Sequence, residues 1–294
     1  MRWEFEATGT LWAITTARPL PRSLQRAVTE HVEGFEAAWS RFRPDSLVSR
    51  AASARSGGTY RLPAGSGPML DLYDRLHALT GGRLDPLVGA DLVRLGYDPQ
   101  YSFVVHEAPD DPGNSRLVRL SWAQTVTHVG DEMTLRAPVL VDVGAVGKGL
   151  LVDQVSDLLL AAGCPTHVVD GSGDLRVRGG RTVCVGLEDP DAPGRIVGSV
   201  EVREGAICAS ATTRRAWGEG WHHILVGLTG RPARGVSASW VLAPTCAMAD
   251  GLSTALFLAE PDALAEGFDF DFALLRSDRS ALISQTFPGE LYLA

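Results

Sequence analysis

The segment VDVGAVGKGLLVD, at residues 141–153, holds an apolar run, three glycines within six positions around one lysine, and the start of an amphipathic stretch. This order predicts a strand, a glycine-rich loop and then a helix. Backbone N–H groups at such a helix start favour an anion, and Lys148 adds a positive charge. The glycine spacing matches neither the Walker A loop nor the dinucleotide fingerprint. A phosphate-binding loop and a purely structural tight turn therefore both stay open.

A second glycine cluster, DGSGD at residues 170–174, follows a β-rich run and carries Asp170 and Asp174. Aspartate and glycine are typical of turns, because the aspartate side chain bonds nearby backbone and glycine adopts positive φ. The first interpretation is therefore a turn between two strands. Two glycine clusters that flank one helix also suggest a shared cleft.

In AMADGLSTALFLAE, at residues 247–260, Asp250 and Thr254 lie four positions apart, so a helix places them on one face. Grouped hard oxygens suit Mg²⁺, which takes one or two carboxylates and completes its shell with water and substrate phosphates. The alternative is structural: an early aspartate favoured by the helix dipole and a threonine that fills space in the core.

In WHHILVGLTG, at residues 221–230, two histidines are adjacent in a strand-like run. Successive side chains of a strand point to opposite faces, so one of the pair can face solvent while the other enters a cleft. Histidine is the side chain best suited to accept a proton near neutral pH, although a hydrogen-bonded structural histidine is the alternative.

The composition excludes several classes of protein. The chain has 294 residues, 45% of them hydrophobic, and a net charge of -8, and it has no basic run of the kind that binds nucleic acid. The N-terminal residues show no signal region, and no apolar run is long enough to span a bilayer, so we expect a cytoplasmic protein without membrane insertion. The four cysteines have no C-x-x-C spacing, which favours free thiols over a disulfide frame or zinc site.

The order of the elements predicts an α+β fold. We expect a strand over 3–16 interrupted at Gly9, helices over 22–39 and 69–80, short strands between 101 and 143, and a helix that ends at Gly163. Strands dominate afterwards, with helices at about 247–260 and 261–266. This pattern indicates mixed sheets with packed helices, in a two-lobed single domain that spans residues 1–294.

Seven blocks occur in an order that resembles the FAD:protein FMN transferases, the ApbE-like flavin transferase family. The blocks are FEATGT (5–10), FEAAWSRFRPDSLVSR (35–50), TGGRLDPLVGADLVRLGYD (80–98), VDVGAVGKGLLVD (141–153), DGSGDL (170–175), HHILVGLTG (222–230) and ADGLSTALF (249–257). Nearly the whole chain is covered. The departures from the family pattern are Thr8 for methionine, Ala51-Ala52 for the turn asparagine, Asp170 for asparagine and Val226-Gly227 for Asp-Pro.

The resemblance implies a role for individual residues. Three oxygens would bind Mg²⁺: the Ala145 carbonyl and the side chains of Asp250 and Thr254. His223 would be the base, and His222 would face away. The residues that would contact FAD are Thr8, Phe42, Arg83, Leu84, Asp85, Asp142, Lys148 and Ile224.

The implied reaction is phosphoryl transfer on the pyrophosphate of FAD. A threonine of a target protein would attack the FMN phosphorus, AMP would leave, and FMN would stay on the protein as a phosphoester. Mg²⁺ and Lys148 would neutralise charge on the phosphate oxygens. Two other activities stay open: a Mg²⁺-dependent FAD pyrophosphatase that yields FMN and AMP, and a non-catalytic FAD-binding protein.

Overall fold

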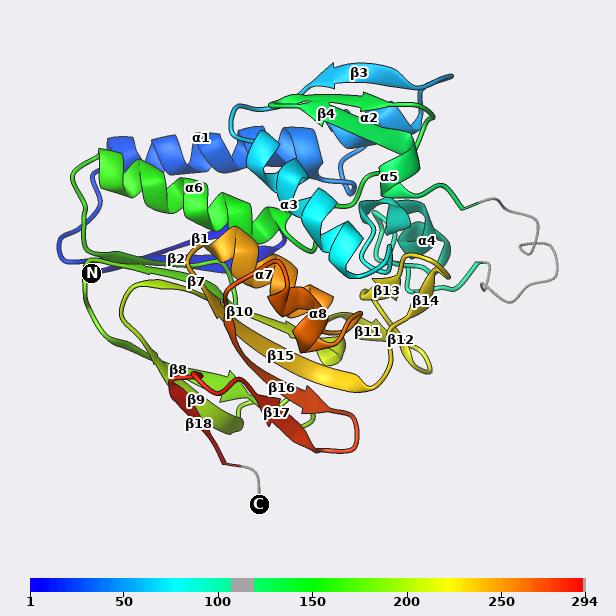
Figure 1. The fold of residues 1–294 in the computed structure, drawn as a ribbon. Helices are drawn as coiled ribbons and strands as arrows, with labels where there is room; N and C mark the ends of the chain where they lie inside the picture. Colours follow the sequence, from blue (N-terminus) through cyan, green and yellow to red (C-terminus); the bar gives the residue numbers. More distant parts are fainter. Residues whose placement is uncertain (107–118, 293–294) are drawn as a thin grey trace.

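An eight-stranded antiparallel sheet runs through the middle of the molecule (Figure 1). The computed structural model describes residues 1–106 and 119–292. Within them the order across the sheet is β1-β2-β6-β7-β10-β15-β16-β17. The strands are β1 (Arg2–Ala7), β2 (Thr10–Thr16), β6 (His167–Asp170), β7 (Asp174–Arg178), β10 (Gly205–Ala211), β15 (Val236–Ala243), β16 (Asp271–Arg276) and β17 (Ala281–Ile283).

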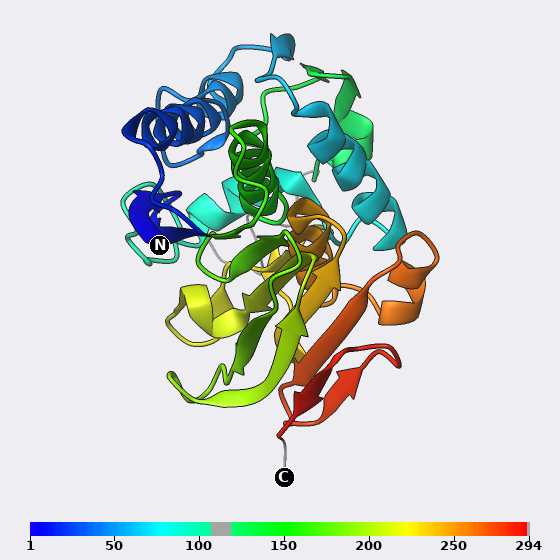
Figure 2. The ribbon, with the colours of Figure 1, turned by 90° about the vertical axis from the view of Figure 1, so that its left-hand side faces the viewer.

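Helices cover one face of this sheet, as Figures 1 and 2 show. They are α1 (Arg22–Trp39), α3 (Gly67–Leu79), α6 (Gly147–Ala161) and α7 (Cys246–Ala255). In α1 the side chains of Val28, Val32, Phe35 and Trp39, at helical spacing, are buried against the core. No helix of the described residues combines the length and apolar character needed to cross a membrane.

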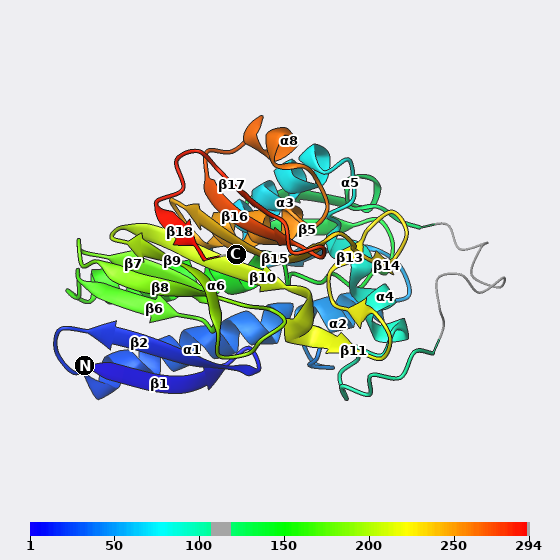
Figure 3. The same ribbon diagram turned by 90° about the horizontal axis from the view of Figure 1, so that it is seen from below.

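A three-stranded sheet packs against the opposite face (Figure 3). Its strands are β8 (Val183–Glu188), β9 (Ile196–Val202) and β18 (Gly289–Leu291). Alternation along β10 separates the two cores: Ala206 and Cys208 belong to the helix side, whereas Ile207 joins Trp240 of β15 between the two sheets. The central strands are therefore buried on both faces.

Shorter elements surround these layers. They are α2 (Leu47–Ala52), η1 (Pro86–Val88), α4 (Gly89–Arg94), α5 (Trp122–Thr125), η3 (Thr212–Arg215), α8 (Pro261–Ala265), the sheet of β3 (Gly58–Arg61), β5 (Glu132–Leu135) and β4 (Val126–Val129), and the pairs β11 (Ala216–Trp217) with β12 (Trp221–His222) and β13 (Leu225–Val226) with β14 (Arg231–Pro232). The β3-β5-β4 sheet lies near α2 and α5 at the top of Figure 1.

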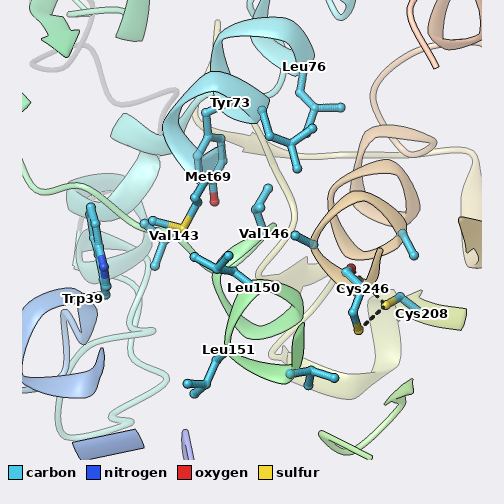
Figure 4. Close-up of a cluster of buried hydrophobic side chains, with 14 of the residues drawn as sticks. Trp39, Met69, Tyr73, Leu76, Val143, Val146, Leu150, Leu151, Cys208 and Cys246 are labelled. Carbon is cyan, nitrogen blue, oxygen red and sulfur yellow. Dashed lines mark hydrogen bonds between the residues drawn. The ribbon is translucent and has the colours of Figure 1, made fainter. Parts of the chain in front are cut away.

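The helix-side core reaches the start of α6, where Tyr73 of α3 points toward Val146 (Figure 4). Cys208 of β10 and Cys246 of α7 close the other end of this cluster, with their Sγ atoms 3.3 Å apart. Both are free thiols, and burial raises the pKa of each. They therefore pack as small neutral core residues.

Helix α6 also caps helix α7. The carboxylate of Asp153 accepts hydrogen bonds from the backbone N–H groups of Cys246 at 3.0 Å and Ala247 at 2.9 Å. These two donors have no partner within α7, because they belong to its first turn. Burial raises the pKa of Asp153, and the two backbone donors oppose that rise. One side chain thus sets the position of α7 relative to α6.

The α+β class is confirmed, and so are most of the expected elements. Helix α1 has the expected bounds, and the interruption at Gly9 is the turn of the β1-β2 hairpin. Helix α3 stops before Gly81 and Gly82, whose φ angles are +58° and +79°. The DGSGD cluster is the turn between β6 and β7, as the first interpretation held. The single domain over residues 1–294 stays a prediction.

Other expectations are wrong. Residues 139–143 form no strand, because Asp142 bonds to Pro86 and Gly144 rather than to a neighbouring strand. The run 221–230 is interrupted after His222, and α7 ends at Ala255, with a turn replacing the rest of the expected helix. Residues 102–106 form no strand. Of the short strand expected over 116–122, residues 116–118 lie outside the described residues, and residues 119–121 form no strand because α5 begins at Trp122.

We expect Asp153→Ala to lower the free energy of unfolding by about 1–3 kcal/mol, because two buried backbone donors lose their acceptor. Asp157→Ala is the matched control, since this aspartate lies one turn later on α6, is exposed and forms an ion pair with Arg178. It should change stability by less than about 0.5 kcal/mol. Urea unfolding of both variants is the measurement, and equal losses would contradict the capping role.

Candidate active site

Close packing explains the glycines that open α6. None of Gly144, Gly147 and Gly149 has a positive φ, so left-handed backbone is not the reason for them. A Cβ on Gly149 would lie 2.4 Å from the carbonyl oxygen of Cys246, and one on Gly144 would lie 2.7 Å from the carboxylate of Asp142. The glycines let the helix start approach α7 and let the loop fold around Asp142.

Asp142 is held from three directions. Its Oδ2 accepts a hydrogen bond from Arg41 Nε at 2.5 Å, and its Oδ1 accepts one from the Gly144 N–H at 2.7 Å. Its own N–H donates to the carbonyl of Pro86. The Arg41 side chain is 2% exposed, and its second terminal nitrogen has no partner among the described residues. A buried guanidinium with an unmet donor is suited to an anion.

Lys148 lies among acidic groups. Its ammonium forms an ion pair with Asp174, which is fully buried in β7 and whose Oδ1 has no partner among the described residues. Burial raises the pKa of Asp250 to about 6, and Lys148 opposes this rise more than any other group. Asp250 Oδ2 accepts a hydrogen bond from the Gly149 N–H at 2.9 Å. The first turn of α6 is therefore bound to β7 and to α7 at once.

The hydroxyl of Tyr73 lies near two of these carboxylates. Burial raises its pKa, and the charges of Asp142 and Asp250 raise it further, while the backbone of Ala145 and Val146 acts in the opposite sense. The backbone N–H groups of Ala145 and Val146 face the hydroxyl, but among residues 1–106 and 119–292 no group forms a well-aligned hydrogen bond with it. A buried polar atom without a partner is rare in native proteins unless a water or ligand serves it.

The expected magnesium ligands occupy the same region, but no three His, Cys, Asp or Glu side chains of the described residues form a metal-binding group. Thr254 Oγ1 lies 3.3 Å from Ser210 Oγ, one turn after Asp250 on α7. A carboxylate, a hydroxyl and the carbonyl of Ala145 are all hard oxygens, and the region also has unmet buried oxygens. This donor set fits Mg²⁺ with substrate phosphates completing its shell.

The two histidines differ in their surroundings. His222 is buried, its Nε2 donates to the Ala233 carbonyl at 2.9 Å, and its Nδ1 accepts from the Ile224 N–H. The His222 ring does not face solvent, because its hydrogen bond to Ala233 holds it inside the protein. His223 has a buried Nδ1 without a partner among the described residues. Burial lowers the pKa of His223 to about 4, and Asp142 opposes this fall. His223 is therefore neutral at pH 7 and close to Asp142.

Thr8 and Phe42 lie on the N-terminal side of the site. Thr8 sits in the β1-β2 turn with φ +51°, and its N–H donates to the carboxylate of Glu36 on α1 at 2.6 Å. Phe42 follows α1, and the guanidinium of Arg41 lies 4.2 Å from its ring centroid. Phe42 and Asp142 thus share one arginine.

Leu84 and Ile224 serve the core. Leu84 is 3% exposed and Ile224 is 4% exposed, and both belong to the helix-side core. Neighbouring residues join the two segments: the Gly227 N–H donates to the Arg83 carbonyl at 2.7 Å, and a Cβ on Gly227 would lie 2.5 Å from Cβ of Asp85. The glycine at this departure from the family pattern permits that contact.

Asp85 and Arg83 have different environments. The buried carboxylate of Asp85 accepts hydrogen bonds from the backbone N–H groups of Leu87 and Trp122, so it fixes local structure. Arg83 instead lines a surface pocket of about 620 Å³, together with Trp221 and Arg234. FAD contacts of these residues stay a prediction.

The expected site is therefore assembled in part. One group of the expected residues is connected through shared partners: Phe42, Asp142, Lys148, Asp250 and His223. A second group mainly stabilises the fold: Leu84, Asp85 and Ile224. Sequence reasoning missed the roles of three further residues: Arg41, Tyr73 and Asp174. Arg41 directly precedes Phe42 and Asp174 closes the DGSGD cluster, so position was an available signal for both. No signal marked Tyr73.

The family model of the ApbE family matches residues 8–270, and the chain belongs to this family. A relative named FAD:protein FMN transferase from Vibrio cholerae is 28% identical over 81% of this chain and 73% of the relative. Another of that name, from Haemophilus influenzae, is 29% identical over 80% of this chain and 72% of the relative.

A relative from Rhodobacter capsulatus, also named FAD:protein FMN transferase, is 28% identical to this chain. The match covers 87% of this chain and 50% of the relative. Solved structures show the same fold. The ApbE protein of Thermotoga maritima has a TM-score of 0.83 at 21% identity, with 97% of each chain covered. The flavin transferase ApbE of Vibrio cholerae has a TM-score of 0.79 at 24% identity, with 98% and 97% covered.

We expect Gly149→Ala to destabilise the protein by about 1–3 kcal/mol, because its Cβ would overlap the backbone of Cys246 and force α6 and α7 apart. Gly34→Ala is the matched control, since a Cβ there would meet nothing within 4 Å in the helical α1. That change should be neutral or stabilise by up to about 1 kcal/mol. Urea unfolding of both variants is the measurement. If Gly149→Ala left the free energy of unfolding unchanged, α6 and α7 would be able to move apart at little cost.

The neutral state of His223 predicts a pH effect on stability. Its folded pKa of about 4 lies below the ordinary 6.5, so between these values the unfolded chain binds the extra proton and the folded chain does not. Stability from this group is complete above pH 6.5 and falls as the pH drops toward 4, by up to about 3 kcal/mol.

We expect His223→Gln to flatten the dependence of the unfolding free energy on pH between 4 and 6.5. His128→Gln is the comparison, because this histidine lies on β4 beside Asp74, outside the site. Chemical denaturation at several pH values provides the data. If the His223 variant keeps the wild-type slope, the imidazole is not held neutral.

Proposed function

We propose that the chain transfers FMN from FAD to a threonine of an acceptor protein, with release of AMP and with Mg²⁺ as the metal. One observation carries the proposal: the start of α6 gathers Lys148, two acidic groups and the Asp142–Arg41 pair. The similar relatives are named FAD:protein FMN transferase, which supports the transfer of FMN from FAD to a protein. In the proposed reaction the threonine oxygen forms a bond to the FMN phosphorus, and the bond from that phosphorus to the AMP oxygen breaks.

The basic groups would bind the pyrophosphate of FAD. Arg41 has a spare terminal donor beside Asp142, and Lys148 is oriented by its ion pair with Asp174. Phosphoryl transfer depends mainly on position and on charge neutralisation, so two cations held in place by carboxylates are suited to it. Asp142 and Asp174 would act by holding these cations.

The carbonyl of Ala145 and the side chains of Asp250 and Thr254 would hold Mg²⁺. When bound, the ion would neutralise negative charge on the phosphate oxygens. The hydrogen bond from Gly149 to Asp250 Oδ2 at 2.9 Å keeps that carboxylate at the helix start, and it helps to offset the effect of burial on the pKa of Asp250.

His223 would accept the proton of the acceptor threonine. Its buried Nδ1 has no partner among the described residues, and its low pKa keeps it unprotonated at pH 7. A base of low pKa is ready at neutral pH but attracts the proton weakly, so the nearby Asp142 would help by stabilising the imidazolium. A general base of this kind typically contributes about 10²–10⁴-fold.

The test is mass spectrometry of an acceptor peptide incubated with the protein, FAD and Mg²⁺. We expect the peptide to gain one FMN phosphoester while AMP is released, and the same peptide with alanine for threonine to stay unchanged. His223→Ala and Asp250→Ala should each lower the rate at least about 100-fold. Asp157→Ala, a change on the exposed side of α6, should keep it.

Other outcomes would redirect the proposal. Free FMN and AMP with an unmodified peptide would mean that water replaces the threonine, so the chain would be an FAD pyrophosphatase. FAD that binds but stays intact with several acceptors would leave a flavin-binding protein. A cytoplasmic location stays a prediction.

A further inference from the structure

A cluster of aromatic side chains borders the site, and one loop contributes its exposed part. The loop is residues 98–106, between α4 and the end of the first described range. Tyr101 and Phe103 are each 40% exposed, although both are large aromatic residues. Phe103 stacks on Tyr97 with ring centroids 6.3 Å apart, whereas the Tyr101 ring extends to Phe42.

Tyr101 stacks on Phe42, the ring that was expected to contact the flavin. Their centroids lie 5.1 Å apart and their planes are parallel to within 1°. On its far side, the Tyr101 hydroxyl lies 3.7 Å from the position of a Cβ on Gly9, next to Thr8. Tyr101 therefore joins Phe42 to the turn of Thr8, and both of these residues were expected to contact FAD.

The loop is built to hold this position. The buried Asp98 carboxylate accepts hydrogen bonds from the N–H groups of Gln100 and Ser102 and from the Ser102 hydroxyl. These bonds lower the pKa of Asp98 below its ordinary value, so the carboxylate stays charged at neutral pH. Gly96 lets the two ends of the loop approach each other closely, because a Cβ there would lie 2.5 Å from the Val104 nitrogen.

Backbone strain accompanies the exposed rings. Tyr101 has a φ of +51° and Phe103 one of +52°, in the left-handed region that bulky residues avoid. Such conformations are strained and concentrate at ligand clamps and switches. A strained loop that exposes a tyrosine parallel to a second ring has the shape of an aromatic clamp.

We propose that Tyr101 is the second wall of the isoalloxazine subsite and sets affinity for the flavin end of FAD. The proposal rests on the proposed function, because it assigns this role within the same FAD site. The parallel rings of Phe42 and Tyr101 separate to admit the flavin, which stacks on them, or Tyr101 swings out and covers it. In both cases the tyrosine ring contacts flavin and leaves the pyrophosphate untouched.

The test measures binding of FAD, FMN and ADP by calorimetry with Mg²⁺ present. Tyr101→Ala should weaken FAD and FMN at least about fivefold, since alanine removes one stacking surface, and should leave ADP unchanged. Tyr101→Phe keeps the ring and should bind within about twofold of wild type. Phe103→Ala is the matched control, because it removes an equally exposed ring of the same loop that does not stack on Phe42.

The outcomes separate the two proposals. Wild-type protein that binds no FAD would overturn the proposed function itself. FAD binding by wild type with equal binding by Tyr101→Ala would overturn the clamp alone. Equal weakening of FMN and ADP, or an equal loss in Phe103→Ala, would show that the loop acts by general stability, which also contradicts the clamp. Circular dichroism of each variant checks that it is folded.

Discussion

The close approach of helix α6 to the N-terminus of helix α7 is the constraint on which the site depends. Only a residue without a Cβ fits at Gly149, because the carbonyl of Cys246 would lie 2.4 Å away. That approach lets the Gly149 N–H reach Asp250, and it lets Asp153 cap α7 one turn further along. Without it, the carboxylate on α7 and the lysine on α6 would not share one region.

Helix patterns in the sequence predicted the framework well, because burial of one face imposes a strong period. The apolar positions of α1 specified its bounds, and glycines marked where α3 and α6 stop. The segment 139–143 misled for a physical reason: its alternating valines resemble a strand, but the backbone bonds to Pro86 and to an aspartate turn. A short local pattern carries no information about hydrogen bonds to backbone that is distant in the sequence.

Residues of the candidate site could be proposed from the sequence where they stand in a motif. Lys148, Asp250 and His223 stood out because their neighbours form recognisable blocks. Arg41 and Tyr73 did not, since an arginine after a helix and a tyrosine within one are common. Their importance comes from burial beside Asp142, which only the fold creates. Asp85 shows the converse: its place in a block predicted a ligand contact, whereas its carboxylate is occupied by two backbone N–H groups.

The balance of acidic and basic side chains around α6 affects how two ligands bind together. Asp142, Asp174 and Asp250 face two cations, Arg41 and Lys148, so the site has no surplus positive charge when all are ionised. In the proposed reaction, a pyrophosphate would add two negative charges to this balance, and repulsion grows in a region of low dielectric. A cation that enters with it would remove the imbalance. Binding of the proposed nucleotide and cation would then be reciprocal: each would raise the affinity for the other by the same factor.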